Sequence, residues 1–414
     1  MKKTLKILCA CLSAALTLTP FTACKKVKKL SKFSVELTAD AKVSVEAKAL
    51  NDDAVKSLAD FSFSAFKSVY ETAEDKRTIF SPVSLAFCLG LVANGTSGET
   101  KAEIESAYSA SLSDLNENLS YLVKKINSDK TAETANSVWL RDGFANSVKS
   151  DYLKTVKSYY DAQVYASPFD DHTLSDINKW GYNATDGMIE KVIDYIDPRD
   201  VLYLINSLHF ESKWKDKYEK TDIKKRSFTN ENGETSAVDM LHSSHSQYMD
   251  FGNAYGVSKF YENTKYAFAA ILPHEGVSLT KFVSSLTGEK FISAYKKQSR
   301  ANVTLAFPEF SFDNALDLKP VLKAMGINKV FAPDTADFSA IADENLYLGF
   351  IKQIAKIDVS RNGTKAAAIT IGGGKSTSAA PTENINVICD RPFCFAIIDV
   401  ETALPLFFGT VTRI

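Results

Sequence analysis

The stretch GTKAAAITIGGGKSTSAAP, residues 363–381, departs from the pattern of the rest of the chain. Its only large apolar side chains are Ile369 and Ile371, so it cannot bury itself. An irregular segment of more than about 15 residues inside a compact domain is functional or disordered. At a period of two residues, one face is small and uncharged throughout: Thr364, Ala366, Ala368, Thr370, Gly372, Gly374 and Ser376. We therefore expect a loop that can enter a sheet as a strand, with this face over the core.

Regular patterns on both sides of this loop indicate the fold class. Helical periodicity dominates the first half, at residues 53–71, 84–93, 100–108 and 112–126. Runs rich in β-branched and aromatic residues predict strands at 137–140, 201–210, 267–272, 303–306, 351–359, 385–389, 393–399 and 406–411. No linker or internal repeat divides the chain after residue 51. The sequence thus predicts one α+β domain, residues 51–414, with helices packed on large, mainly antiparallel or mixed sheets.

Composition and missing motifs exclude several kinds of protein. A chain of 414 residues that is 45% hydrophobic can bury a large core, and its net charge of -1 leaves no basic field for nucleic acid. Residues 374–376, Gly-Lys-Ser, lack the first glycine of a phosphate-binding loop, because Ile369 stands at that position. His242 and His245 have no third metal ligand nearby, and the chain has no Gly-x-Ser-x-Gly elbow of a hydrolase. We expect no cofactor, no metal and no enzymatic activity.

The N-terminus carries signals for export rather than for folding. Lysines precede an apolar stretch, residues 7–18, which is too short to span a membrane and is typical of a secretory signal. The stretch ends in residues 21–24, Phe-Thr-Ala-Cys, which resemble a bacterial lipobox; the alternative is an ordinary signal peptide with a chance cysteine. We expect removal of residues 1–23, lipidation of Cys24, and a linker at residues 24–50. The protein would then be exported, as a cell-surface lipoprotein held at a membrane by its N-terminal lipid or as an extracellular protein.

Ten short motifs, in order along the chain, resemble the serpin family of serine protease inhibitors. They are TIFSPVS (78–84), GTSGET (95–100), NSVW (136–139), INKW (177–180), TDGMI (185–189), LINSLHFESKW (204–214), FPEFSF (307–312), GTKAAA (363–368), DRPF (390–393) and PLFFG (405–409). The resemblance implies a monomer with three β-sheets, eight or nine helices and an exposed reactive loop. It also implies a covalent complex: the target serine protease forms an ester with the loop, which inserts into the main sheet and traps the acylated enzyme.

The resemblance assigns residues to three parts of this machinery. The hinge of the loop is Gly363, Thr364, Lys365, Ala366, Ala367 and Ala368. The residues beneath the part of the sheet that opens are Ser81, Ser84, Asn206, Trp214 and Gln353. Three positions depart from the pattern of many serpins: Arg361 and Lys365 replace glutamates, and Gln353 replaces a histidine. None of them puts a charge on the small face, so we still expect inhibition, with an altered rate or stoichiometry.

The bond that the protease cuts is predicted by counting from the hinge. As in inhibitory serpins, this count places the cut after Thr377 and before Ser378, while counting back from residues 390–393 places it near Pro381. The small neighbours Ser376, Ala379 and Ala380 favour an elastase-like enzyme, and Ala379 and Ala380 are alternate sites. Lys375 is the rival site, which a trypsin-like enzyme would choose. The alternative function is that of a non-inhibitory serpin, acting as a binding module or chaperone.

Overall fold

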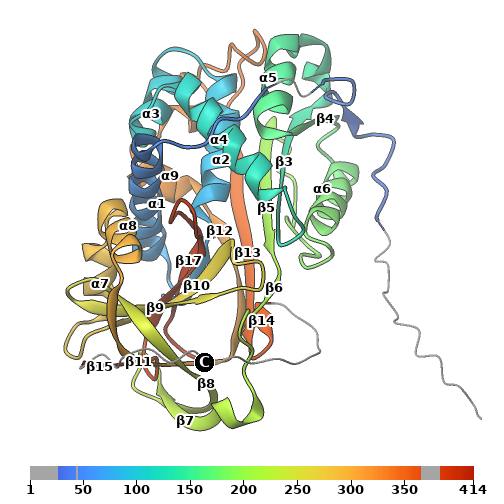
Figure 1. Ribbon diagram of the computed structural model, residues 1–414. Helices are drawn as coiled ribbons and strands as arrows, with labels where there is room; N and C mark the ends of the chain where they lie inside the picture. The colour runs from blue at the N-terminus through green and yellow to red at the C-terminus, as the bar shows by residue number, and fades with distance from the viewer. Residues whose placement is uncertain (1–26, 43–44, 365–382) are drawn as a thin grey trace, which may run out of the picture.

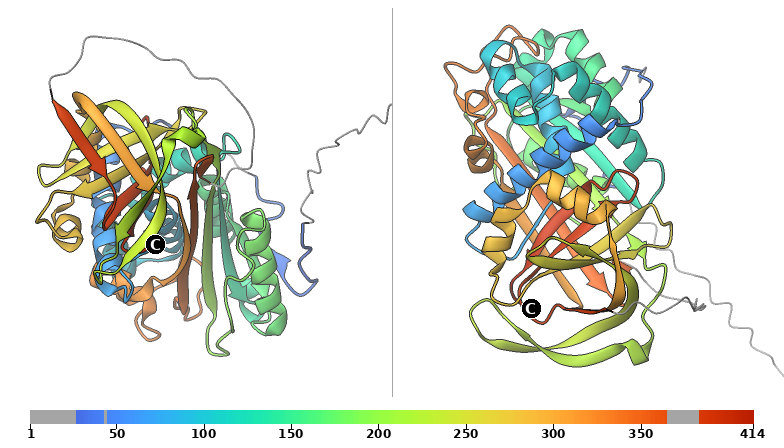
Figure 2. Two further views of the ribbon diagram at one scale, coloured as in Figure 1. Left: turned by 90° about the horizontal axis from the view of Figure 1, so that it is seen from below. Right: turned by 60° about the vertical axis from the view of Figure 1, so that its left-hand side comes forward.

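The computed structural model describes residues 27–42, 45–364 and 383–414. Two large sheets lie against each other, with helices α2 to α5 at one end of the molecule and the β7–β8 hairpin at the other (Figures 1 and 2). The predicted signal segment, Cys24, hinge residues 365–368 and the predicted scissile bond lie outside the described residues.

The first sheet has eight strands and contains the functional site. Its order is β1–β4–β3–β5–β13–β14–β6, and β12 pairs with β13. The bounds are β1 (Val35–Glu36), β3 (Ala132–Arg141), β4 (Gln163–Ser167), β5 (Leu202–Phe210), β6 (Ser212–Lys213), β12 (Phe310–Asp317), β13 (Phe350–Ser360) and β14 (Gly363–Thr364). Strands β3 and β5 are antiparallel, whereas β5 and β13 are parallel, so this sheet is mixed.

The second sheet has nine strands, in the order β15–β11–β8–β9–β10–β16–β17–β2, with β7 paired to β8. Its strands are β2 (Thr78–Phe80), β7 (Ile223–Thr229), β8 (Thr235–Asp250), β9 (Ala254–Phe260), β10 (Tyr266–Pro273), β11 (Ser299–Pro308), β15 (Asn384–Ile388), β16 (Phe393–Asp399) and β17 (Pro405–Val411). Strand β8 is 16 residues long and pairs with β7 and β11 before its last residues pair with β9. The two smaller sheets expected from the resemblance are therefore continuous through β8.

Nine α-helices occur in the described part of the chain, within the predicted eight or nine. They are α1 (Asp52–Thr72), α2 (Pro82–Gly95), α3 (Gly98–Tyr108), α4 (Leu112–Ile126), α5 (Ser150–Tyr160), α6 (Asp171–Ala184), α7 (Leu279–Ser285), α8 (Gly288–Lys296) and α9 (Lys319–Ala324). Helix α2 is apolar around almost its whole circumference because it lies between the sheets and contacts β5 of one and β17 of the other. The α+β prediction is confirmed.

Helix α6 covers the outer face of the eight-stranded sheet, away from α2 (Figure 1). A separate apolar cluster fills this interface, with Ile177 and Trp180 of α6 packed near Trp139, Tyr165 and Tyr203 of the sheet. No described helix is both long enough and apolar enough to cross a membrane. The core of the domain thus has two layers, one on each side of the sheet that contains β5 and β13.

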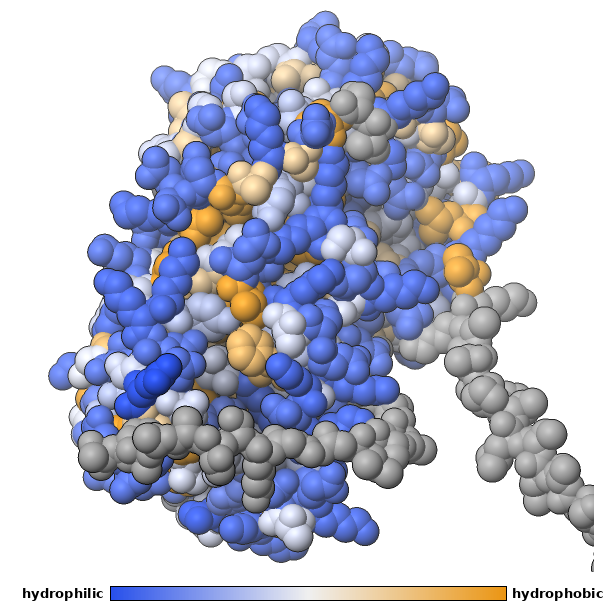
Figure 3. Space-filling model, in the orientation of Figure 1, coloured by the Kyte–Doolittle hydropathy of each residue, from blue (hydrophilic) through white to orange (hydrophobic). Residues whose placement is uncertain are grey.

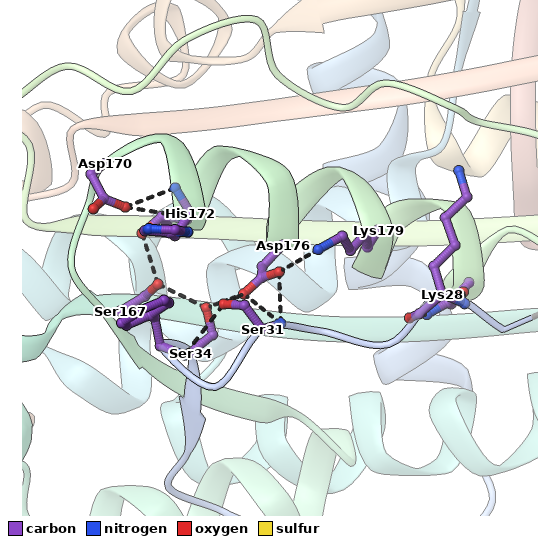
Figure 4. A network of polar contacts seen from close by, with 11 residues as sticks. Lys28, Ser31, Ser34, Ser167, Asp170, His172, Asp176 and Lys179 are labelled. Carbon is purple, nitrogen blue, oxygen red and sulfur yellow. Dashed lines mark hydrogen bonds and ion pairs between the residues drawn. The ribbon is translucent and has the colours of Figure 1, made fainter.

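The prediction of a linker at residues 24–50 is wrong for residues 27–38, which are attached to the domain. Val35 and Glu36 form β1, which pairs with β4 at the edge of the first sheet. Ser31 and Ser34 donate hydrogen bonds to the buried carboxylate of Asp176 in α6 (Figure 4). The segment was mistaken for a linker because polar groups make most of these contacts, and hydrophobic periodicity cannot detect them. The folded unit therefore begins before residue 51.

Candidate functional site

Strands β5 and β13 diverge from a short contact at one end. They pair through Phe350 with Tyr203, Ile351 with Leu204, and Lys352 with Ile205. Beyond these three residue pairs, no strand in the described part of the chain occupies the space between residues 206–210 of β5 and residues 353–358 of β13. The sheet therefore contains a partly open seam, closed at one end by a small number of backbone hydrogen bonds.

The first residues of the predicted hinge occupy the open end of this seam. Gly363 and Thr364 form β14, which is antiparallel to both β13 and β6. Gly363 has φ +143, and a Cβ atom there would lie 2.2 Å from the Ser212 carbonyl oxygen and 2.6 Å from the Lys213 Cα. Only glycine can adopt this backbone conformation so close to a neighbouring strand. The loop thus begins between β13 and β6, and β6 follows β5 after a single residue in the chain.

Thr364 points into the core, where a chain of contacts holds it. It is 2% exposed, and its hydroxyl lies 2.6 Å from the Tyr261 hydroxyl. The Tyr261 ring stacks on Trp214 with 4.8 Å between centroids and 9° between planes, and burial raises the pKa of Tyr261. The Trp214 indole Nε1 donates to the Ser360 carbonyl at 2.8 Å. Trp214 therefore holds the end of β13 and the start of the loop together.

A buried lysine adds to this aromatic cluster. The Lys259 ammonium lies 4.5 Å from the centre of the Tyr218 ring and 5.8 Å from that of Trp214. Burial lowers the pKa of Lys259 to about 8, although Asp216 and Asp222 partly oppose the shift. The site beneath the hinge is consequently apolar and aromatic, with its one cation stabilised by ring faces.

Gln353 ties the middle of β13 to the N-terminus of α2. Its side-chain oxygen accepts from the Ser81 amide at 2.7 Å, and its side-chain nitrogen donates to the Ser81 carbonyl at 2.8 Å. The Ser81 hydroxyl accepts from the Ser84 amide, so Ser81 is also the N-cap of α2. Gln353, which departs from the family pattern at this position, thus forms a reciprocal pair of hydrogen bonds with Ser81 within the core.

Asn206 of β5 is buried and incompletely bonded. Its side-chain nitrogen donates to the Asn136 side-chain oxygen at 2.8 Å and to the Thr134 hydroxyl at 3.1 Å. Its side-chain oxygen has no hydrogen-bond partner among the described residues, and neither has the buried hydroxyl of Ser212 in β6. Each unpaired buried group costs about 1–3 kcal/mol. The seam is therefore a region of stored free energy.

A cavity of about 530 Å³ lies over the outer side of the seam. Its lining includes Phe210 of β5, Ile354 and Lys356 of β13, Thr364 of β14, and residues 187–191 after α6. Such a volume in a well-packed protein leaves the lining atoms without contacts on one side. The separated strands therefore lack packing partners as well as hydrogen-bond partners.

The unexpected basic residue beside the hinge has an acidic partner. The Arg361 guanidinium forms two hydrogen bonds with the Glu309 carboxylate, at 2.9 and 2.5 Å, and the Arg361 amide forms a third at 2.7 Å. These hydrogen bonds lower the pKa of Glu309. Arg361 therefore fixes the turn between β13 and β14, and its charge is not left free at the hinge.

The structure brings Ser81, Ser84 and Gln353 together, and it places Trp214 against Ser360, seven residues beyond Gln353 on β13. Each has partners that the sequence did not reveal. Ser81 and Gln353 are in direct contact, Trp214 reaches the end of β13, and Asn206 pairs with Asn136 of β3. Sequence analysis missed Tyr261, Glu309 and Lys259, because their contacts join residues far apart in the chain. His245 is partly buried and bonded to Ser243, and the described residues contain no cluster of ligands for a metal ion.

Comparison with known proteins now identifies the family. The model of the serpin (serine protease inhibitor) family matches residues 56–414. The chain belongs to the serpin family. Human neuroserpin is 28% identical over 382 residues, which cover 86% of this chain and 90% of neuroserpin. Rat glia-derived nexin is 29% identical over 377 residues, 86% of this chain and 92% of the nexin.

Among solved structures, the thermophilic serpin tengpin in its native state is 34% identical, with a TM-score of 0.85. The match covers 92% of this chain and all of tengpin. Tengpin in its latent state gives a TM-score of 0.77, at 33% identity and with 89% of this chain covered. The chain is therefore more similar to the native state of that serpin than to its latent state.

Proposed function

We propose that this serpin inhibits serine proteases by trapping the acyl-enzyme, with the cleaved loop inserted between β5 and β13. The position of β14 carries the proposal. Gly363 and Thr364 already lie as a short strand at the mouth of the seam, between β13 and β6. Further insertion extends an existing strand and needs no new nucleus, and it breaks the three residue pairs that join β5 to β13.

The register of β14 supports the small face predicted for the loop. Thr364 pairs with Val359, and Gly363 pairs with Ser360. Continuing this antiparallel register places Ala366 opposite Ile357 and Ala368 opposite Ala355. Both β13 residues are buried, and residues opposite each other in a sheet point to the same side. The inserted strand would place Ala366 and Ala368 over the core, and Lys365 and Ala367 toward solvent.

Until the loop inserts, the catalytic groups of the protease carry out the chemical steps. The protease serine oxygen bonds to the Thr377 carbonyl carbon, the peptide bond to Ser378 breaks, and the protease's histidine gives its proton to the leaving amine. Thr377 lies thirteen residues beyond Thr364, and a strand of that length spans about 43 Å. Insertion over this distance would carry the acylated protease along the sheet and distort it before water hydrolyses the ester.

An elastase-like protease is the proposed target, because the residues around Thr377 are all small and suit a shallow specificity pocket. The test is incubation with elastase-like and trypsin-like enzymes, followed by denaturing electrophoresis. We expect a stable complex with the elastase-like enzyme, and none when its catalytic serine is replaced by alanine. A released C-terminal fragment that starts at Ser378, Ala379 or Ala380 supports the assignment, whereas one that starts at Ser376 shows trypsin-like cleavage at Lys375. An intact loop with no complex would instead indicate the non-inhibitory alternative.

We also infer export, acylation of Cys24, and action as a monomer at a membrane surface or outside the cell. The lipobox-like residues 21–24 after a secretory signal support this proposal. Mass spectrometry of the mature N-terminus should find an acylated cysteine, and Cys24→Ser should yield a soluble protein. An unmodified Cys24 in the wild-type protein would refute the acylation.

A further inference from the structure

The N-terminal segment, residues 27–38, is fixed to the domain along its inner side (Figure 4). The Lys28 amide donates to the Asn183 side-chain oxygen at 2.8 Å, and the Asn183 side-chain nitrogen donates back to the Lys28 carbonyl at 2.7 Å. Near the other end, the Leu37 amide donates to the Val164 carbonyl at 2.7 Å. The segment is therefore bonded to α6 at one end and to β4 at the other.

Asp176 holds the middle of the segment. Its carboxylate accepts from the Ser31 amide at 2.9 Å and from the Ser31 and Ser34 hydroxyls at 2.5 and 2.8 Å. The Lys179 ammonium lies 3.1 Å away (Figure 4). Burial alone would raise the pKa of Asp176, but these hydrogen bonds outweigh it and lower the pKa. The bonds also compensate the buried charge.

The outer side of the same segment is apolar and basic. Val27 is 78% exposed, Phe33 45% and Val35 56%, three of only six large hydrophobic residues that are exposed in the described part of the chain. Lys28, Lys29 and Lys32 lie among them and are also exposed. Figure 3 shows hydrophobic side chains next to the point where the N-terminal trace leaves the domain. The exposed carboxylates of Asp170 and Asp171, beside the His172 ring that stacks on Phe33, mark the border of this surface.

Three apolar side chains and three lysines, all exposed within residues 27–35, are the composition of surfaces that bind at the interface of an anionic membrane. The apolar groups enter the headgroup region, and the ammonium groups are attracted to lipid phosphates. Isolated exposed apolar residues need no explanation, but a cluster on a rigid segment does. Val27 follows Cys24 by three residues, a span of at most about 11 Å. Any lipid on Cys24 would therefore hold this segment at the membrane surface.

We propose that the outer side of residues 27–35 is a lipid-binding surface, which seats the serpin domain on an anionic membrane in one orientation. This inference goes beyond protease inhibition and does not require it. The segment is bonded to α6 and β4, so its contact with lipid fixes the orientation of the whole domain. The β7–β8 hairpin lies at the far end of the molecule from the helices next to this segment (Figure 1).

The first test measures binding to vesicles without an acyl chain. The mature chain from residue 24, with Cys24→Ser, should bind vesicles of phosphatidylglycerol and phosphatidylcholine and should not bind phosphatidylcholine alone. Substituting Lys28, Lys29 and Lys32 by glutamine should weaken binding by about 100-fold, because each lysine near an anionic surface contributes about 1 kcal/mol. The Lys28 backbone binds Asn183, but the Lys28 ammonium lies 3.6 Å from the centre of the Tyr182 ring of α6. The double variant of Lys29 and Lys32 keeps this contact and should therefore weaken binding by about 30-fold.

The matched control removes the same charge elsewhere. Lys224, Lys225 and Arg226 are consecutive exposed residues of β7, and their substitution by glutamine should leave vesicle binding unchanged. An equal loss in both triple variants would overturn the proposal, because it would show that net charge alone drives adsorption. Failure of the parent chain to bind anionic vesicles would also overturn it.

The second test locates the contact. The three tryptophans of the chain, Trp139, Trp180 and Trp214, are buried, so a new exposed tryptophan reports on its own surroundings. Brominated lipids should quench the fluorescence that Phe33→Trp adds. The control is Phe260→Trp, at the end of β9, where a large apolar residue is also exposed. Equal quenching of the two variants, or none in either, would refute an oriented lipid contact.

Discussion

Replacing one of two adjacent alanines by glutamate tests the insertion mechanism directly. The register of β14 places Ala366 opposite Ile357, which is 2% exposed, and Ala367 opposite Lys356, which is exposed. Ala366→Glu therefore buries a carboxylate when the loop inserts, whereas Ala367→Glu places the same group in solvent beside a lysine. The two variants have the same composition and differ only in the side of the strand that carries the charge.

The size of the effect follows from desolvation. Burying an unpaired carboxylate costs about 3 kcal/mol or more, and a penalty of that size during insertion slows it about 150-fold. Hydrolysis of the acyl-enzyme then overtakes insertion, so Ala366→Glu should be cleaved as a substrate. Ala367→Glu should still form the covalent complex. The cost of burying the charge arises only when the loop inserts, so the thermal midpoints of the two uncleaved variants should match that of the wild type.

The assay is titration of the protease with each variant, followed by denaturing electrophoresis to compare complex with cleaved serpin. We expect the stoichiometry of inhibition to rise steeply for Ala366→Glu only. Equal behaviour of the two variants would refute the register, because no difference between inward and outward positions would remain. Normal trapping by both would refute insertion between β5 and β13.

Three further predictions concern the seam and the N-terminal segment. Cleavage of the loop by a catalytic amount of protease should raise the thermal midpoint sharply, because the inserted strand fills the seam; an unchanged midpoint would argue against insertion. Gln353→Ala should lower the free energy of unfolding by about 2 kcal/mol, since it leaves the Ser81 amide and carbonyl without partners, and urea unfolding would measure the loss. The pKa of Asp176 is lower in the folded protein than in an unfolded chain. Its contribution to the free energy of unfolding is therefore full above about pH 4 and is lost as the pH falls through the pKa of the folded state. The protection factor of the Ser31 amide against hydrogen exchange should therefore fall in acid, and Asp176→Asn should show low protection at neutral pH as well.

Local periodicity predicted those elements whose pattern is self-contained. The helix expected at residues 112–126 is α4, and the strand expected at 393–399 is β16, each with the observed bounds. The small face of the loop stays a prediction, because only its first residue, Thr364, lies in the described part of the chain. The chain order of the motifs supplied the rest of the fold through a family resemblance.

Contacts between distant residues could not be predicted in the same way. Tyr261 and Thr364 are in contact although they are 103 positions apart in the chain, and no local pattern around either residue predicts this contact. Ser31 meets Asp176 across 145 positions through hydrogen bonds, which leave no hydrophobic pattern. The same lack of pattern made an attached segment resemble a linker. In the sequence, Arg361 was only a departure from the family pattern beside the hinge, because its partner Glu309 lies 52 positions earlier and could not be recognised as such.

The cavity beside the seam has a consequence for anyone who would engineer this protein. Filling internal voids is a standard route to a more thermostable variant. A larger side chain at Ile354, which lines the cavity, would fill part of it in the intact molecule and leave less room for the incoming strand. Such a variant would survive heating better and lose the difference in free energy that drives the loop into the sheet. For this fold, greater thermal stability of the intact protein and efficient trapping of the protease are opposing design goals.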